Sequence, residues 1–534
     1  MTRSPYPRRR FLIHTGALGL GTSLGLTACG SDDSPEAPAV IVPDSERPRL
    51  PYGIQIGDVG GGRAVVWARA DRPAQLRVEY DTTDSFRNPR KVLGPTVSAA
   101  SDFTGRVELT GLPAGESIFL RVAYDSIDNP RATGVAVPGQ FRTVPRTDAN
   151  RPVRFVWGGD VAGQGWGINT EFGGMRIFEA MRRREPDFFL HSGDTIYADG
   201  PILAETTAEN GRIWKNVVTP EVAKVAETLD EYRGRYRYNL MDENVRRFSA
   251  EVPQIWQWDD HEVTNNWSPT KDLSADARYT EKNIATLVAR ATQAFREYAP
   301  MRIGSTAAEQ TLYRKVSYGP LLDVFVLDMR TYRGGNTANL QTVENGDTVF
   351  LGNEQLEWLV NGVKQSQATW KIIAADMPIG LWVPDGKDAA GNARWEAIAN
   401  GNDGAALGRE LETARLLRAI KGVPNVVWLT ADVHYCAAHY YDPSKAQFTD
   451  FSPFWEFVAG PLNAGTFGPN QLDATFGPQL VFQKAPPAGQ ANLSPYSGFQ
   501  FFGEVNIDPS TKALTVDLRD LDGVSVFSKT LPVA

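Results

Sequence analysis

Apolar and polar residues alternate in short runs from residue 52 to about residue 143. Clear examples are the segments 63–68 and 75–80, with Gly, Pro and Asp between successive runs. A period of two is typical of strands that bury one face, and nothing in this stretch has the spacing of a long helix. The pattern predicts a β-sandwich over residues 52–145.

Beyond Pro152 the pattern changes to compact apolar runs that each end in polar residues. The runs are 155–157, 188–190, 254–257, 324–327, 372–374 and 426–429. The helix-like segments between them are 175–184, 284–298, 353–367 and 408–420. Strands that alternate with helices predict an α/β catalytic domain over residues 152–534, and ligands in such domains bind where strands end.

Alternation returns in the segment 501–533, which we interpret as an antiparallel hairpin that closes this domain. Two long stretches interrupt the strand and helix pattern. They are residues 199–251 and the Gly-, Asn- and Asp-rich residues 383–408. We expect both to roof the functional site and to set the size of the substrate.

The N-terminus is typical of a signal peptide. Residues 7–13 read Pro-Arg-Arg-Arg-Phe-Leu-Ile, and an apolar, Gly-rich run follows over residues 16–28. The paired arginines resemble the twin-arginine export signal of bacteria, which implies the twin-arginine export machinery as a partner and a periplasmic or cell-surface location.

Residues 26–29, Leu-Thr-Ala-Cys, resemble a lipobox, in which Cys29 would carry a lipid anchor; the alternative is an ordinary cleavage site. Residues 1–29 are therefore the predicted signal peptide. Residues 30–51, rich in Ser, Asp and Pro, are predicted to be a disordered tether. No later stretch is long and apolar enough to span a bilayer.

Composition narrows the function. The 534 residues are 42% hydrophobic, enough for more than one packed unit, and the formal charge of -8 gives no basic surface for nucleic acid. Two cysteines, Cys29 and Cys436, exclude thiolate zinc sites and a disulfide framework. An anionic substrate would need local positive charge, which bound cations supply compactly.

Five of the six apolar runs lead into an aspartate that is a candidate ligand. These residues are Asp160, Asp194, Asp260, Asp376 and Asp432. Aspartate is unfavourable inside strands and costly to bury unpaired, so five carboxylates that meet at one edge need cations to neutralise them. Any one of them is equally well explained as a helix cap or a turn residue, so only the set is informative.

The residues around these aspartates form four motifs. They are Gly-Asp at 193–194 followed by Tyr197, Trp-Asp-Asp-His-Glu-Val-Thr-Asn-Asn at 258–266, Leu-Asp-Met-Arg-Thr-Tyr-Arg at 327–333, and Ala-Asp-Val-His at 431–434. Their order resembles the calcineurin-like metallophosphoesterases and, in detail, the alkaline phosphatase D family. The resemblance covers roughly the whole mature chain, and it implies the four-layer metallophosphoesterase sandwich with an N-terminal fibronectin type III-like β-sandwich.

The resemblance also implies two metal positions bridged by Asp194. The first would take Asp160, Tyr197 and His434, and the second Asp260, Asp376 and Asp432. A phenolate ligand favours ferric iron, and three carboxylates favour calcium. Fe³⁺ and Ca²⁺ are therefore the preferred pair, with Mn²⁺, Mg²⁺ or Zn²⁺ as alternatives.

Further residues receive roles from the same resemblance. His261 would hydrogen-bond a phosphoryl oxygen or protonate the leaving group; the alternative is a buried histidine that orients a carboxylate. Arg330 would bind phosphate oxygens, unless it forms a buried pair with Asp328 that braces the site. The amides of Asn265 and Asn266 would coordinate or orient groups beside the ligands.

The resulting prediction is an exported hydrolase of phosphate monoesters, diesters or both, in which a hydroxide that bridges the metals attacks phosphorus. One alternative is a phosphodiesterase or a phospholipase D-like enzyme that acts on larger diesters. A further alternative is a non-catalytic binding protein anchored at the cell surface.

Overall fold

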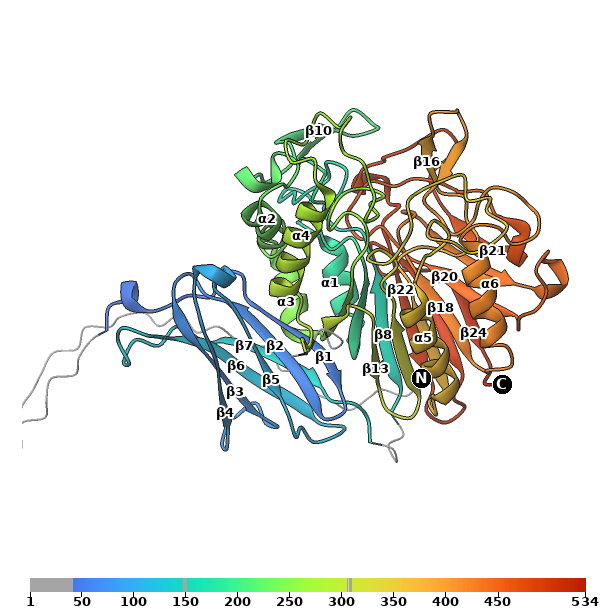
Figure 1. Cartoon of the computed structure of the whole chain (residues 1–534). Helices are drawn as coiled ribbons and strands as arrows, with labels where there is room; N and C mark the ends of the chain where they lie inside the picture. The colour runs from blue at the N-terminus through green and yellow to red at the C-terminus, as the bar shows by residue number, and fades with distance from the viewer. Residues whose placement is uncertain (1–41, 147–150, 305, 307–309) are drawn as a thin grey trace, which may run out of the picture. The chain divides into compact units, whose positions relative to one another are not determined.

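The computed structural model describes residues 42–146, 151–304, 306 and 310–534. Their strands form two large sheets, one four-stranded sheet and two short hairpins, and six α-helices lie outside the large sheets (Figure 1). Cys29, the twin-arginine segment and most of the predicted tether lie outside the described residues. Within the described residues, no helix has the length and apolar character needed to cross a bilayer.

The first large sheet has nine strands in the order β24-β23-β22-β8-β9-β12-β1-β2-β5. In chain order the strands are β1 (Ile54–Gly60), β2 (Arg63–Arg69), β5 (Thr104–Leu109), β8 (Val153–Gly158), β9 (Phe188–Ser192), β12 (Gln254–Gln257), β22 (Phe501–Ile507), β23 (Leu514–Asp520) and β24 (Ser525–Leu531). Strands β8, β9 and β12 are parallel neighbours. Their carboxyl ends therefore lie along the same edge of the sheet.

The second large sheet has seven strands in the order β13-β14-β15-β18-β20-β19-β21. The strands are β13 (Arg314–Ser317), β14 (Leu322–Val326), β15 (Trp370–Ala374), β18 (Val426–Thr430), β19 (Cys436–Tyr441), β20 (Phe454–Val458) and β21 (Pro478–Lys484). Strands β14, β15 and β18 are parallel. All six apolar runs of the α/β region are thus strands, as predicted.

Alternate residues of these strands pack into two different hydrophobic cores, one on each face of the sheet. In β8, Phe155 and Trp157 pack between the two large sheets with Ile372 and Leu429, whereas Val156 faces the opposite side. Because successive side chains of a strand point to opposite faces, each sheet is apolar on both faces and must be covered twice.

The helices provide the outer layers (Figure 1). Helices α1 (Arg176–Arg182), α2 (Leu229–Asn239), α3 (Glu243–Glu251) and α4 (Ile284–Tyr298) share the core of Val156, and helices α5 (Asn353–Gln365) and α6 (Glu410–Ala419) cover the seven-stranded sheet. The order helix, sheet, sheet, helix gives the four-layer α/β arrangement expected from the sequence.

The N-terminal β-region contributes to two sheets. Strands β1, β2 and β5 belong to the nine-stranded sheet, because β1 pairs in parallel with β12. The facing sheet has the order β4-β3-β6-β7, with β3 (Ala74–Asp81), β4 (Arg90–Val97), β6 (Ser117–Ser126) and β7 (Val137–Arg142). The predicted β-sandwich is therefore present, and one of its sheets continues into the catalytic sheet.

Two expectations about connecting segments need correction. Residues 42–51 were assigned to a disordered tether, but they carry a short helix at Asp44–Glu46, and the Arg49 amide donates to Asp71 at 2.9 Å. The segment 199–251 was expected to roof the site. Its second half instead forms helices α2 and α3 of the outer layer, because α2 buries Tyr and Arg side chains and α3 buries Val245 and Phe248.

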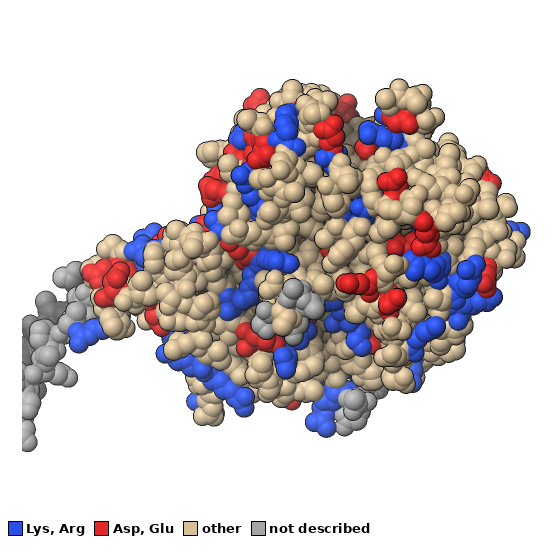
Figure 2. Space-filling view, viewed as in Figure 1, with Lys and Arg blue, Asp and Glu red and all other residues tan. Residues whose placement is uncertain are grey.

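Acidic and basic side chains are interspersed over the face shown in Figure 2. On this face the two signs are mixed, and the basic side chains do not form the continuous stripe that is typical of nucleic-acid-binding surfaces. The distribution agrees with the small net charge of the chain.

One polar cluster ties the β-sandwich to the helices. The Asp102 carboxylate, after β4, accepts hydrogen bonds from Arg69 of β2 at 2.7 Å, from Arg237 of α2 at 2.6 Å and from the hydroxyl of Tyr298. Burial raises the pKa of Asp102, but the bonds from Arg69 and Tyr298 and the charge of Arg237 outweigh it, so the pKa is lowered overall. The ionised form therefore stabilises the fold.

We predict that Asp102→Asn lowers the free energy of unfolding by about 2 kcal/mol near pH 7, because the half-buried Arg69 loses its acidic partner and Arg237 loses its shortest one. Thermal unfolding of the variant and the wild type across a pH series measures the effect. A lowered carboxyl pKa stabilises above the unfolded value, about pH 4, and this contribution is lost as the pH falls through the folded value.

The matched control is Asp272→Asn, because Asp272 bonds only within its own exposed turn at Ser274. It should leave the melting temperature unchanged. Equal melting temperatures for Asp102→Asn and the wild type at pH 7 would contradict the proposed role of the cluster.

Candidate metal centre

A polar pocket of about 340 Å³ opens where the parallel strands of both large sheets end. Three of the predicted aspartates line it together with both motif histidines. These residues are Asp194, Asp260, His261, Asp432 and His434. They follow β9, β12 and β18, so the layered topology itself brings distant parts of the chain to one place.

The strand-end turns that present these side chains have unusual backbone conformations. Asp160, Asp194, Asp432 and His434 all have positive φ angles, between 49° and 69°. L-residues seldom adopt this left-handed region, and aspartate tolerates it better than most. Several such residues side by side are a feature of functional sites, where surrounding structure holds the strain.

Two glycines make room for these turns. A Cβ atom at Gly193, which has a φ of 93°, would lie 2.4 Å from the Cβ of Asp259. A Cβ atom at Gly460 would lie 2.3 Å from Oδ2 of Asp160. Neither position can carry a side chain without displacing an acidic residue of the pocket.

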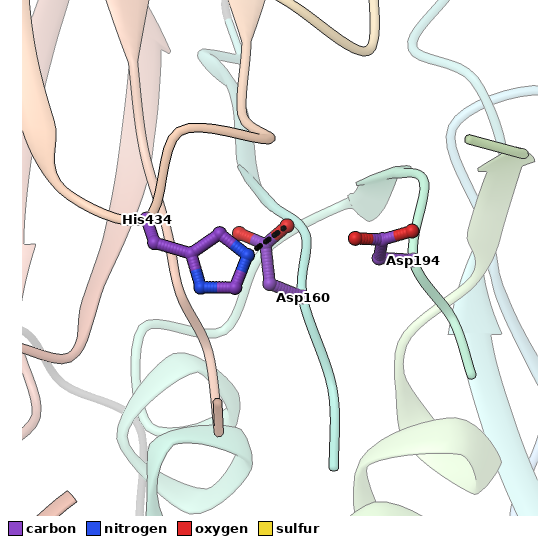
Figure 3. A group of neighbouring side chains, drawn as sticks. All are labelled: Asp160, Asp194 and His434. Atoms are coloured by element: carbon purple, nitrogen blue, oxygen red, sulfur yellow. Dashed lines mark ion pairs between the residues drawn. The ribbon is translucent and has the colours of Figure 1, made fainter. Parts of the chain in front are cut away.

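Asp160, Asp194 and His434 form the first group of ligand-type side chains, whose nearest donor atoms lie within 4.8 Å of one another (Figure 3). Nε2 of His434 is 3.7 Å from the Asp160 carboxylate, the pair marked by the dashed line. The Tyr197 hydroxyl is 2.8 Å from the same Nε2. The structure thus brings together all four residues predicted for the first metal position.

The state of His434 suits a metal ligand. Its Nδ1 hydrogen-bonds the Gly465 carbonyl, so this nitrogen carries the proton and Nε2 keeps its lone pair. Burial lowers the pKa of His434 to about 4, which keeps the ring neutral. A neutral imidazole held by a carbonyl is the usual arrangement of a metal-ligating histidine.

The second group consists of Asp259, Asp260 and Asp432, again within 4.8 Å of one another. The resemblance had implied Asp376 in place of Asp259. In the structure, Oδ1 of Asp376 accepts from the Met377 amide at 2.9 Å and Oδ2 from Nε of Arg330 at 3.1 Å. Asp376 therefore lies in the same acidic cluster but directs both oxygens to other partners.

Arg330 occupies the centre of this cluster with its side chain fully buried. It pairs with Asp259, Asp376 and Glu396, and its Nη2 is 3.7 Å from Asp432. The predicted contact with phosphate oxygens is thus absent from this arrangement, because the guanidinium has no exposed surface. Arg330 is therefore better described by the alternative, a buried residue that braces the site. Its guanidinium pairs with these acids, whereas Asp328 accepts only from the Arg330 backbone amide.

The acids fit bound cations. Both carboxylate oxygens of Asp160, Oδ1 of Asp260 and Oδ2 of Asp259 are buried without a hydrogen-bond partner in the described structure. Burial and the charge of Asp432 raise the pKa of Asp160 well above its usual range. Unpaired buried carboxylates are costly, and the donor set of oxygens with one imidazole suits hard metal ions.

His261 stands beside both groups. Its Nδ1 lies 2.5 Å from Oδ1 of Asp199, and its ring stacks on Tyr197 with centroids 4.2 Å apart. Burial lowers the pKa of His261, but the charges of Asp199, Asp260 and Asp194 outweigh it and raise the pKa well above the usual value. Asp199 fixes the ring orientation and leaves Nε2 as the nitrogen available to the pocket.

The other predicted residues have supporting positions. Asn265 is exposed at the rim, and its backbone N–H donates to Oδ2 of Asp199 at 3.0 Å. Asn266 donates from Nδ2 to Asp385 at 2.8 Å and from its backbone amide to Asp260. Asp328 accepts from Nε1 of Trp258 at 2.9 Å and so holds the strand before the acidic turn.

Sequence reasoning missed several residues of the site. Asp199, Asp259, Glu262 and Glu396 are buried and bonded to predicted residues. Glu262 accepts from Thr195 at 2.6 Å and from the Asp259 amide at 2.8 Å, and so ties the turn after β9 to the turn after β12. Asp259 and Glu262 lie inside the Trp-Asp-Asp-His-Glu motif, which was the available signal; Glu396 had none.

Comparison with known proteins identifies the family. A model described as PhoD-like phosphatase matches residues 155–518, and the model of the PhoD-like phosphatase N-terminal domain matches residues 35–145. The chain belongs to the PhoD-like phosphatase family. It is 28% identical over 490 residues to alkaline phosphatase D of Bacillus subtilis strain 168, covering 87% of this chain and 77% of that protein.

Solved structures confirm the predicted fold class. The structure of PhoD matches with a TM-score of 0.65 and 22% identity, covering 90% of this chain and 89% of that one. Purple acid phosphatase PPD1 from yellow lupin seeds matches with a TM-score of 0.55 and 12% identity, covering 91% and 74%. The PhoD-like chain is accordingly a phosphoesterase hydrolase of a metal-dependent family, and the resemblance found in its motifs is confirmed.

We predict that Gly460→Ala lowers the affinity for metal by about 10- to 100-fold, since the new methyl group would displace the Asp160 carboxylate of the PhoD-like site. Metal content of the purified variant, measured by mass spectrometry against titrated free metal, provides the test. Gly404→Ala is the control, because its nearest neighbours would be 3.5 Å or more away. Full metal occupancy in Gly460→Ala would contradict the assignment of Asp160.

Proposed function

We propose that this PhoD-like protein hydrolyses phosphate esters with two cations bound among the strand-end acids. The observation that carries the proposal is the convergence of Asp160, Asp194 and His434, whose ligand atoms lie within 4.8 Å, beside buried carboxylate oxygens that lack partners. Buried carboxylate oxygens without partners are costly, and bound cations would offset that cost.

The first cation would be held by Asp160, Asp194, Tyr197 and His434. The second would be held by Asp194, Asp260 and Asp432, with Asp259 closer to this position than Asp376. Ferric iron suits the first set because of the phenol, and calcium suits the carboxylates of the second, with Mn²⁺, Mg²⁺ or Zn²⁺ as alternatives. Bound cations would neutralise phosphoryl oxygens and activate water as the nucleophile.

His261 would act on the leaving group. Its Nδ1 is fixed by Asp199, so Nε2 faces the pocket and can donate a proton to the departing alkoxide. Arg330 would act at a distance from the substrate, since its guanidinium holds Asp259 and Asp376 in place. The charge of Arg330 offsets part of the acidic cluster and leaves the remainder to the cations.

The substrate would be a phosphate monoester or diester that fits a pocket of about 340 Å³. Val383 and Pro384, from the segment 383–408, line this pocket, whereas no residue of the segment 199–251 does. The segment 199–251 therefore lies behind the residues that line the pocket. The segment 383–408 forms part of the pocket wall and would limit the size of the substrate.

We also propose export through the twin-arginine pathway to the periplasm or the cell surface, with Cys29 as a lipid attachment site. The support is the sequence of residues 7–29 alone, which lies outside the described residues. Metabolic lipid labelling of the wild type and of Cys29→Ser tests the anchor, and loss of label in the variant is expected.

We predict that complete chelation of the purified protein abolishes hydrolysis of aryl phosphate mono- and diesters, and that Fe³⁺ with Ca²⁺ restores it, because the buried acids need both charges. Steady-state assays with each ester, paired with a metal inventory, measure this. If the rate of hydrolysis is unchanged after complete removal of metal, the proposal is wrong.

We predict that Asp199→Asn lowers kcat by about 10- to 100-fold with little change in metal content, because the His261 ring loses its orienting carboxylate. The assay compares kcat for substrates with good and poor leaving groups. A proton donor matters most for poor leaving groups, so the loss should be larger for alkyl than for nitrophenyl esters. An equal loss for both would point to a structural defect instead.

A further inference from the structure

The loop after β8 carries a feature that the metal ligands leave unexplained. It runs from Asp160 to Trp166, and Gln164 within it lines the same pocket as Asp194 and His261. Gln164 has a φ of 53°, in the left-handed region that residues other than glycine, asparagine and aspartate seldom adopt. The chain thus holds a glutamine in an unfavourable conformation at the wall of the pocket.

The surrounding structure fixes this conformation on both sides. The Ala162 amide donates to the Asn463 carbonyl at 2.7 Å, and the Trp166 amide donates to the Gly163 carbonyl at 3.0 Å. Asn492 bridges the loop, since its Nδ2 donates to the Gln164 carbonyl at 3.3 Å and its Oδ1 accepts from Nε1 of Trp166 at 2.8 Å. The side chain of Gln164 is therefore directed by a braced backbone.

Gly163 brings the loop close to the first metal position. A Cβ atom at Gly163 would lie 2.5 Å from the ring of Tyr197, so the backbone runs directly over this ring. Gln164 follows directly in the chain, and its side chain lines the pocket together with His434, which the Tyr197 hydroxyl contacts. The braced loop consequently has one polar side chain directed to the pocket.

The side-chain oxygen of the half-buried Gln164 has no partner of its own. This Oε1 atom is buried and makes no hydrogen bond within the described structure. A half-turn of the amide exchanges Oε1 with Nε2, so the same position can present a donor. Buried amide groups are almost always hydrogen-bonded in folded proteins, so an unused one at a binding pocket indicates a ligand.

The pocket is short of donors for an anionic group. Among its described lining residues there is no Lys or Arg, and Asp194, Asp260 and Asp432 can only accept when ionised. Asn266 and Asn470 already donate from Nδ2, to Asp385 and to the Trp382 carbonyl, each at 2.8 Å. The side chains whose nitrogen atoms remain for a substrate are the half-buried Gln164 and His261 and the exposed Asn265 at the rim.

We propose that Gln164 is a substrate-binding residue whose Nε2 donates a hydrogen bond to a non-bridging oxygen of the phosphoryl group. This inference rests on the proposed hydrolysis of phosphate esters in the same pocket. An uncharged donor stabilises a phosphoryl oxygen without binding phosphate as tightly as an arginine would, so product release is not slowed.

The test compares Gln164→Ala, Gln164→Glu and Gln164→Gly in the metal-loaded full chain. Gln164→Ala should lower kcat/KM for an aryl phosphate by about 10- to 100-fold, the size expected for a lost hydrogen bond to a charged group. Gln164→Glu should be lower still, because its carboxylate repels the phosphoryl oxygens. Gln164→Gly relieves the backbone and should keep or raise the melting temperature while losing activity like Gln164→Ala.

Binding of inorganic phosphate, measured by calorimetry, gives a readout apart from turnover, and its Kd should rise in the same order while metal content stays constant. Gln341→Ala is the matched control, since Gln341 also has a buried Oε1 without a partner but does not line the pocket. It should match the wild type in kcat/KM and in phosphate Kd.

Two results would overturn the inference. If Gln164→Ala and Gln164→Glu both stay within about twofold of the wild type, the side chain does not bind substrate. If Gln164→Glu retains activity that Gln164→Ala loses, the residue accepts a hydrogen bond and the donor role is wrong. An inactive wild type with bound metals would instead refute the proposed phosphoesterase function, so the two failures are distinguishable.

Discussion

The mutual repulsion of buried carboxylates is the constraint on which this site depends. Six acids lie buried around one edge of two sheets, and Asp432 lies beside them with 13% of its side chain exposed; the six are Asp160, Asp194, Asp259, Asp260, Asp376 and Glu396. At short range in a medium of low polarity, such charges repel by several kcal/mol per pair. The fold tolerates them only because Arg330 neutralises one side of the cluster and the other side is left to cations.

The two sides of the acidic cluster differ in structure because one is neutralised by Arg330 and the other is left to cations. Around Arg330 the acids have geometrically defined partners, and the network extends through Arg333 and Arg409 to the backbone of residues 395–397. Around Asp160 the oxygens have none. A guanidinium makes fixed, planar hydrogen bonds that stabilise the structure, whereas an exchangeable metal ion can also bind substrate and water.

Much of this could be predicted from the sequence, because the relevant signals are local. Apolar runs marked each central strand, and helix α4 was expected with the bounds that the structure shows. Helix α2 was missed because its buried face is made of Tyr and Arg, although Thr228 and Glu231 form the capping box that could have marked its start. Hydrophobic periodicity does not detect a face built from long polar side chains.

The site was predictable where ligands sit at fixed spacing and unpredictable where contacts cross the fold. Asp432 and His434 share one turn, and their joint position followed from the motif. Arg330 arrives from a different strand and pairs with both Asp259 and Asp376, and no local pattern encodes that contact. Gln164 was overlooked for a related reason, since its importance lies in a backbone angle that the sequence does not display.

The shared nine-stranded sheet has a consequence for the edges of the catalytic domain. Without β1, strand β12 would be an edge strand with unpaired backbone amides and carbonyls. The turn that carries Asp259 follows directly after β12. An exposed sheet edge invites association with other chains. The N-terminal β-sandwich thus serves as a permanent cap, and at Gly57 the backbone approaches Gln254 and Pro300 too closely for any side chain. The N-terminal β-region and the catalytic domain therefore meet at a junction where neither backbone can move apart or admit a larger residue independently of the other.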